Sequence, residues 1–147
     1  MIDWQCSPDV SIAFDVNPLI RVLEEVLVDH DSQADVCIVI TDDAHVHRLN
    51  REYRSIDRPT DVLSFELDDE LHPEQNLLGE VYVSIDTATC QASEAGRGLE
   101  EEVAHLAIHG VLHLLGHEHD TDAGFDEMRS AEDHYLNRCQ TLNPRKV

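Results

Sequence analysis

The sequence lacks several features that would place it in a specialised class of proteins. No apolar run approaches the ~20 residues that a transmembrane helix requires. The first residues, MIDWQCSPDV, have neither the basic start nor the long apolar centre of a signal peptide. The four cysteines are scattered and form no C-x-x-C pair, which is more typical of reduced thiols than of a disulfide framework. We therefore expect a soluble, cytoplasmic protein with no membrane partner.

Basic residues are also few. Ten Lys and Arg stand against 31 Asp and Glu, so the formal net charge is −21. Such a charge repels phosphates at long range and, unless salt screens it, argues against a nucleic acid partner. Four of the ten basic residues nevertheless fall within eleven positions: Arg48, Arg51, Arg54 and Arg58. This cluster is either a solvated helix face or a local anion-binding patch.

The patterns that are present predict one α+β domain over residues 1–147. Apolar residues make up 41% of the chain, which is ordinary for a globular protein with one core. Apolar patterns predict strands at 10–14, 36–40, 61–67 and 80–86. Helical spacing and end signals predict helices at 17–28, 43–53, 86–96, 99–115 and 122–138, with a loop at 68–79. We expect a small mixed four-stranded sheet packed with about five helices.

The stretch HGVLHLLGHEHD, residues 109–120, is predicted to bind a metal ion at the C-terminal end of a central helix. Histidines four positions apart on a helix lie about 6 Å apart at the backbone, whereas positions eight apart are separated by about 12 Å. Zinc–nitrogen bonds of ~2.1 Å cannot span the longer interval. A third ligand must therefore follow a break in the helix, which Gly116 supplies. The predicted ligands are His109, His113 and His119.

The other histidines have different predicted roles. His117 is an alternative to His119 as the third ligand. His105 precedes the first ligand by one helical turn, so we expect it to pack or to support a ligand without binding the ion. Packed or solvated roles are predicted for the remaining five: His30, His45, His47, His72 and His134.

Three neutral imidazoles leave a dication its full charge and one open coordination position, as in catalytic zinc sites. Zinc proteases share this histidine spacing, but Gly110 stands where they keep the glutamate that acts as general base. Glu118 and Asp120 flank the third histidine and are either proton-transfer groups or solvated surface acids. The residues alone thus predict a metal-dependent hydrolase of unknown substrate.

The same stretch resembles the H-G-x-L-H-L-x-G-x-D-H signature of the YbeY family, bacterial metal-dependent endoribonucleases. LNREYRSIDRPTDVLSFEL, GEVYVSID and the helix from Leu99 agree with that family in order and spacing, over nearly the whole length. The resemblance implies a small mixed sheet with helices and one zinc ion per chain, held by His109, His113 and His119. It implies cleavage of single-stranded RNA in small-subunit ribosomal RNA maturation and ribosome quality control. The implied partners are the small ribosomal subunit and, beside it, ribosomal proteins or assembly GTPases.

The resemblance also gives the arginine cluster a role. Arg54, in EYR ahead of TDVLSF, matches an arginine that family members place in the active-site cleft. A guanidinium there would stabilise the negative charge that gathers on phosphorus during RNA cleavage. The neighbouring arginines would hold flanking phosphates without reading sequence. Cleavage of an ester tolerates the missing glutamate at Gly110 better than amide hydrolysis does, because an alkoxide is the better leaving group.

One local departure from the family signature concerns the third ligand. His117 and Glu118 stand where relatives usually have Tyr-Asp, which keeps the acid and adds a potential ligand. Two other functions stay open on the sequence. One is a metallohydrolase of peptides or small esters, with Glu118 or Asp120 as base. The other is a non-catalytic ribosome-assembly factor whose zinc is largely structural.

Overall fold

The structure is a computed structural model that describes residues 1–66, 77–117 and 121–142, of which 140–142 are described by their backbone alone. The described elements follow one another in this order: β1 (Ile2–Cys6), α1 (Asn17–Asp29), β2 (Asp35–Thr41), α2 (Asp43–Arg54), β3 (Val62–Glu66), β4 (Leu77–Ser84), α3 (Ile85–Ala95), α4 (Leu99–Leu114) and α5 (Asp122–Leu142). No helix in these ranges is both long and apolar enough to cross a membrane.

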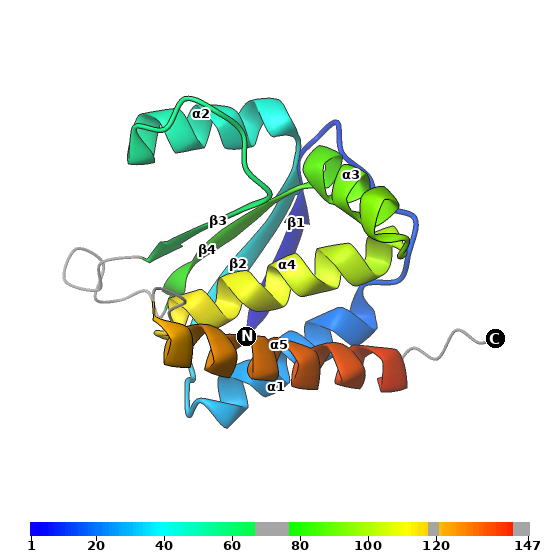
Figure 1. Cartoon of the computed structure of the whole chain (residues 1–147), viewed down its shortest axis with the longest axis vertical. Coiled ribbons are helices and arrows are strands. Elements are labelled where there is room, and N and C mark those ends of the chain that lie inside the picture. Colours follow the sequence, from blue (N-terminus) through cyan, green and yellow to red (C-terminus); the bar gives the residue numbers. More distant parts are fainter. Residues whose placement is uncertain (67–76, 118–120, 143–147) are drawn as a thin grey trace.

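The four strands form one mixed sheet in the order β1-β2-β4-β3. β1, β2 and β4 run parallel, and β3 pairs antiparallel with β4 as an edge strand (Figure 1). Parallel strands need crossover connections: α1 lies in the connection from β1 to β2, and α2 lies in the connection from β2 to β4. The predicted α+β architecture, a small mixed sheet with five helices over the described residues, is confirmed.

The two faces of the sheet are covered by different helices. Consecutive residues of β4 point to opposite faces. Val81 lies against Gly110 of α4, whereas the ring of Tyr82 lies 5.7 Å from the ring of His45 in α2. α4 and α1 therefore cover one face, with α5 packed against both of these helices, and α2 lies on the other side of the sheet (Figure 1).

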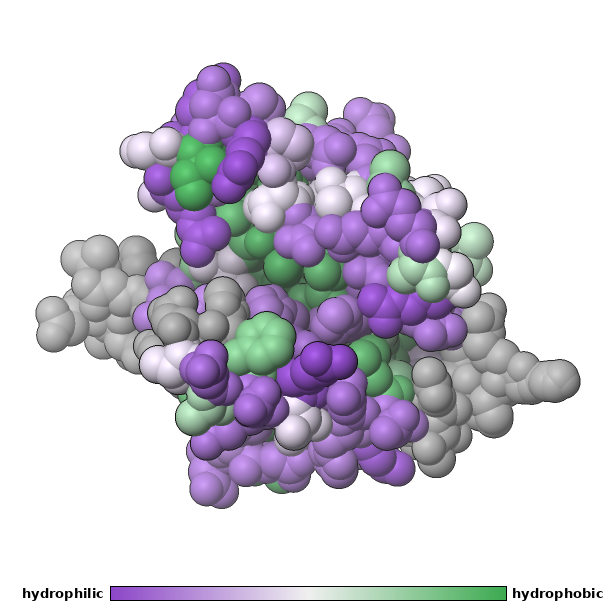
Figure 2. All heavy atoms as spheres, viewed as in Figure 1, coloured by the Kyte–Doolittle hydropathy of each residue, from purple (hydrophilic) through white to green (hydrophobic). Residues whose placement is uncertain are grey.

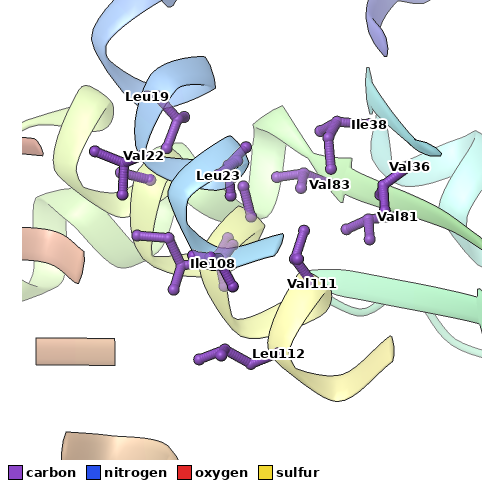
Figure 3. Packing of buried hydrophobic residues seen from close by; sticks show 14 of the residues in the cluster. Leu19, Val22, Leu23, Val36, Ile38, Val81, Val83, Ile108, Val111 and Leu112 are labelled. Atoms are coloured by element: carbon purple, nitrogen blue, oxygen red, sulfur yellow. The ribbon is translucent and has the colours of Figure 1, made fainter. Parts of the chain in front are cut away.

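The core lies between the sheet and the pair α1 and α4. Leu23 of α1, Ile38 of β2, Val83 of β4 and Ile108 of α4 are all completely buried (Figure 3). Close packing of these side chains fixes the rotation of α4 about its axis, because overpacking or voids in a core are costly. The same rotation places His105, His109 and His113 on the partly exposed side of the helix. The packing of the core thus determines which side chains of α4 are accessible for a functional site.

One predicted strand is wrong. Residues 10–14 form no strand, although Val10, Ile12 and Phe14 pack against the core from an irregular connection. The first strand is β1, which pairs with β2 along one edge of the sheet and buries only Ile2. An edge strand with so little burial has a weak apolar pattern. The connection at 10–14 packs alternate residues on the core, so its sequence has the clearer strand pattern although it forms no strand.

The remaining elements agree with the prediction within a few residues. β4 begins at Leu77, so its first residues were predicted to be loop. The rest of that loop, 68–76, and the last residue of the predicted strand 61–67 lie outside the described residues. α3 begins one residue before Asp86, and Ser84 accepts the capping hydrogen bond from the N–H of Thr87. α5 continues to Leu142, beyond the predicted end.

Candidate functional site

Helix α4 ends in the turn that the histidine spacing requires. The N–H of His117 donates to the carbonyl of Leu112 at 3.1 Å, and the N–H of Gly116 donates to that of His113 at 3.1 Å. This pair of bonds defines a Schellman motif, in which the residue at Gly116 adopts a left-handed conformation, here with φ of 99°. Glycine adopts that conformation at little cost. The predicted break after His113 is therefore confirmed.

The structure brings two of the three predicted ligands together. His109 and His113 lie on successive turns of α4, partly buried, with ring centroids 6.1 Å apart. An ion with bonds of ~2.1 Å to each ring fits between imidazoles at this separation. His119, with Glu118 and Asp120, lies outside the described residues, and within the ranges that are described no three acidic, histidine or cysteine side chains are grouped to hold a metal.

A buried carboxylate accepts a hydrogen bond from one ring nitrogen of His109. Nδ1 of His109 donates to Oε2 of Glu132 at 2.6 Å, and Nε2 of His105 donates to the other oxygen, Oε1, at 3.0 Å. Glu132 is 8% exposed and reaches the two histidines from helix α5. When Nδ1 of a neutral imidazole donates, Nε2 carries the lone pair that binds metals. Metal-binding histidines commonly donate their second nitrogen to a carboxylate in this way.

The charges in this cluster are set by the same contacts. Burial acts to raise the pKa of Glu132, but the hydrogen bonds from His105 and His109 outweigh it and lower the pKa to about 2. The hydrogen bond to Glu132 raises the pKa of His105 above its usual value, against the opposing effect of burial. Glu132 is thus an anion at neutral pH, which favours a positive charge nearby. The contact matches the supporting role expected of His105.

Glu132 was not predicted from the sequence, because 23 positions separate it from His109 and no spacing rule joins the two helices. One signal was present. Met128 and Tyr135, four positions before it and three after, are buried, so the acid falls within the apolar stripe of its helix. An acid in an apolar stripe needs a partner.

His117 is in contact with His30. Its Nε2 lies 2.8 Å from Nε2 of His30, at the end of α1, whose Nδ1 donates to the carbonyl of Val26 at 2.8 Å. In a neutral pair His30 therefore accepts and His117 donates. Burial, and then the proximity of His30, lower the pKa of His117. This engagement favours His119 over His117 as the third ligand, which stays a prediction.

Gly110 is a packing residue. Its carbonyl accepts a hydrogen bond from Oγ of Ser64 at 3.1 Å, and a Cβ at this position would lie 2.5 Å from Cγ1 of Val81. The sheet therefore leaves no space for a glutamate one residue after the first histidine. The peptide-hydrolase alternative therefore depends on Glu118 or Asp120 as its base, and both lie outside the described residues.

Gly110→Ala is expected to lower the free energy of unfolding by about 1–3 kcal/mol, because a single added methyl group forces α4 away from β4. Urea denaturation monitored by circular dichroism measures the change. The same exchange at Gly124, partly exposed in α5, is the control, since alanine favours a helix there. Equal stability of Gly110→Ala and wild type would contradict the packing role.

Arg54 lies in the last turn of α2, which ends at Ser55 in a left-handed conformation with φ of 59°. Its side chain is exposed and has no hydrogen bond or ion pair with the described residues. The ring of Tyr53 lies 5.6 Å from that of Phe65, so this turn lies over edge strand β3. Ser64 of the same strand contacts α4 beside His109. The ends of α2 and α4 thus flank one edge of the sheet, without a contact that joins Arg54 to the histidines.

Comparison with known proteins identifies the family. The family model described as Endoribonuclease YbeY matches residues 9–140. The chain belongs to the YbeY family. A YbeY relative from Pelotomaculum thermopropionicum is 44% identical over 127 residues, which is 82% of this chain and 83% of that one. The relative from Clostridioides difficile is 39% identical over 130 residues, covering 82% of this chain and 85% of the other.

The solved structures agree with this membership. The solution structure of a Thermotoga maritima protein matches the whole of this chain with a TM-score of 0.70 and 27% sequence identity, and is itself covered completely. The resemblance and the YbeY fold expected from the sequence are confirmed. The histidine, Glu132 and Gly110 contacts above are therefore features of a YbeY chain.

Proposed function

We propose that this chain is a metal-dependent endoribonuclease that cleaves single-stranded RNA. Its membership of the YbeY family supports the nuclease class, since the relatives carry the name Endoribonuclease YbeY. The observation that carries the metal dependence is the buried pairing of Glu132 with Nδ1 of His109, which fixes the orientation of that ring one helical turn from His113. A carboxylate in that position is typical of metal-binding histidines.

We propose His109, His113 and His119 as the ligands of one zinc ion per chain. An all-imidazole donor set suits zinc, and the turn at Gly116 ends helix α4 between the second and third proposed ligand. When bound, the ion would supply positive charge and Lewis acidity at the phosphodiester. Glu132 and His105 orient the ring of His109, and Arg54 adds a guanidinium from the far side of the edge strand.

The biological setting proposed is the maturation of small-subunit ribosomal RNA and ribosome quality control in the cytoplasm. The proposed partners are the small ribosomal subunit and ribosomal proteins or assembly GTPases. The net charge of −21 means that phosphate contacts come from a local patch instead of from the general field. The exposed arginines of α2, Arg48, Arg51 and Arg54, form such a patch.

The direct test incubates purified protein with single-stranded RNA and, in parallel, with casein. We expect RNA cleavage that a chelator stops and zinc restores, and no proteolysis. The variant His113→Ala, purified identically, identifies any contaminating nuclease. Cleavage of equal rate in that variant, or proteolysis without RNA cleavage, would exclude the proposed function.

Arg54→Ala is expected to lower kcat/KM for RNA by about tenfold and to leave the zinc content unchanged. The effect is modest because an exposed guanidinium acts through water, where charge interactions are weak. Single-turnover cleavage and metal analysis measure the two quantities. Arg21→Ala, which removes an exposed arginine of α1 outside this patch, is the matched control and should change the rate much less. Equal losses in both variants would show a general charge effect in place of a specific role for Arg54.

A further inference from the structure

A pocket of about 570 Å³ opens beside His109, between α4, α5 and the start of β3. Its volume falls within the range of small-ligand sites. In Figure 2, viewed as in Figure 1, hydrophobic residues lie in the hollow between the part of the molecule that contains α2 and the part that contains α5. Its apolar lining comes from three elements: Val62, Leu106, Met128 and Leu136. The pocket therefore has an apolar interior and directly adjoins a candidate metal ligand.

The α5 side of the pocket carries an unusual pair of side chains. Phe125 is 49% exposed, and within the described residues no other ring contacts it. Arg129 follows four positions later, so the two lie on one face of α5, and the guanidinium has no ion pair with the described residues. An exposed aromatic ring beside a guanidinium is the combination on which single-stranded nucleic acid binding proteins stack bases.

The charges of the lining favour a base over a phosphate inside the pocket. The carboxylates of Asp61, Glu132 and Asp133 contribute to the walls. Arg97, the second basic lining residue, is already paired with Glu102 at 2.9 Å. These carboxylates would repel the negative charge of a phosphate, whereas a neutral planar base would not be repelled. Stacking also escapes the long-range repulsion of a chain with net charge −21, since a base carries no charge.

We propose that this pocket binds one unpaired nucleobase of the RNA, stacked on Phe125, with Arg129 against the base or its adjoining phosphate. The proposal rests on the proposed function, because it takes RNA as the substrate. His109 lines the same pocket, so the base belongs to a nucleotide close to the cleaved bond.

The test uses single-stranded RNA oligomers with 2′-O-methyl groups, which bind without being cleaved, and fluorescence anisotropy with the zinc-loaded protein. Phe125→Ala is expected to raise Kd about tenfold, as removal of a base-stacking ring does elsewhere, while Phe125→Tyr binds like the wild type. The loss should be similar at about 0.1 M and about 1 M salt, because stacking is not screened. Val28→Ala, which shortens a 70% exposed side chain on α1, is the matched control and should leave Kd unchanged.

A set of oligomers with one abasic position each locates the base. At one position, the abasic nucleotide should lower the affinity of the wild type about tenfold and should not lower the affinity of Phe125→Ala any further, because the two changes remove the same contact. If every abasic position costs both proteins equally, or if Phe125→Ala binds as the wild type does, no base occupies the pocket. Unchanged RNA affinity would leave an aromatic side chain of a protein partner as the alternative occupant.

Failure of this inference and failure of the proposed function are distinguishable. If the wild type binds these oligomers through Phe125 but does not cleave the all-ribose RNA, the base site stands and the proposed nuclease function is excluded. If the wild type and Phe125→Ala cleave RNA at the same rate, the nuclease function stands and the base site is excluded. If the wild type binds none of the oligomers, the base site is excluded.

Discussion

His113→Ala is expected to abolish zinc binding and to lower RNA cleavage by about a thousandfold or more, since several kcal/mol of transition-state stabilisation depend on the metal. The side chain lies on the partly exposed face of α4, opposite the buried residues that pack on the sheet, so the fold should persist. Alanine also has the highest helix propensity. Zinc content after dialysis, measured by mass spectrometry, and single-turnover cleavage give the two readouts, with circular dichroism as a check on folding.

His117→Ala is the matched control for this prediction. His117 is a histidine of the same segment, but its Nε2 contacts His30, so we expect the variant to keep its zinc. If His117→Ala loses zinc while His119→Ala keeps it, the third ligand has been assigned wrongly. If His113→Ala unfolds together with its loss of metal, the zinc is structural and the non-catalytic assembly factor becomes the better description.

The success of the sequence prediction at α4 has a local cause. The two predicted ligand positions, the four-residue spacing between them and the helix-ending glycine all lie within one stretch, HGVLHLLG. Helical geometry converts that spacing into proximity without knowledge of the rest of the chain. The Schellman motif at Gly116 needs only the local backbone. Such features can be predicted from a single sequence.

The failures involve residues whose neighbours are distant in the chain. β1 becomes a strand because β2 offers it hydrogen bonds about 34 positions later, with Ile2 opposite Val36, and not because its own residues alternate clearly. Glu132 similarly has its role only because α5 packs on α4. Gly110 combines both situations. The sequence showed that glutamate was missing there, but only the contact with Val81 explains why it cannot be present.

Glu132→Gln is expected to weaken zinc binding by about tenfold to a hundredfold, the usual effect of removing a carboxylate behind a metal-binding histidine. His105 and His109 donate to different oxygens of Glu132, and glutamine keeps the shape of the side chain but replaces one of these oxygens by an NH2 group that cannot accept. The loss of negative charge also removes an electrostatic attraction between position 132 and a cation bound at His109. A competition titration with a chromophoric chelator near neutral pH measures the affinity, and cleavage should recover when zinc is supplied in excess.

Glu127→Gln provides the matched control, because it removes one negative charge from an exposed position on the same helix. Its zinc affinity should equal that of the wild type, which separates the specific contact from the general field. Unfolding of the metal-free proteins in urea distinguishes positioning from stability. If Glu132→Gln lowers the free energy of unfolding but binds zinc as tightly as Glu127→Gln does, Glu132 only joins α5 to α4, and the support for a metal at His109 is lost.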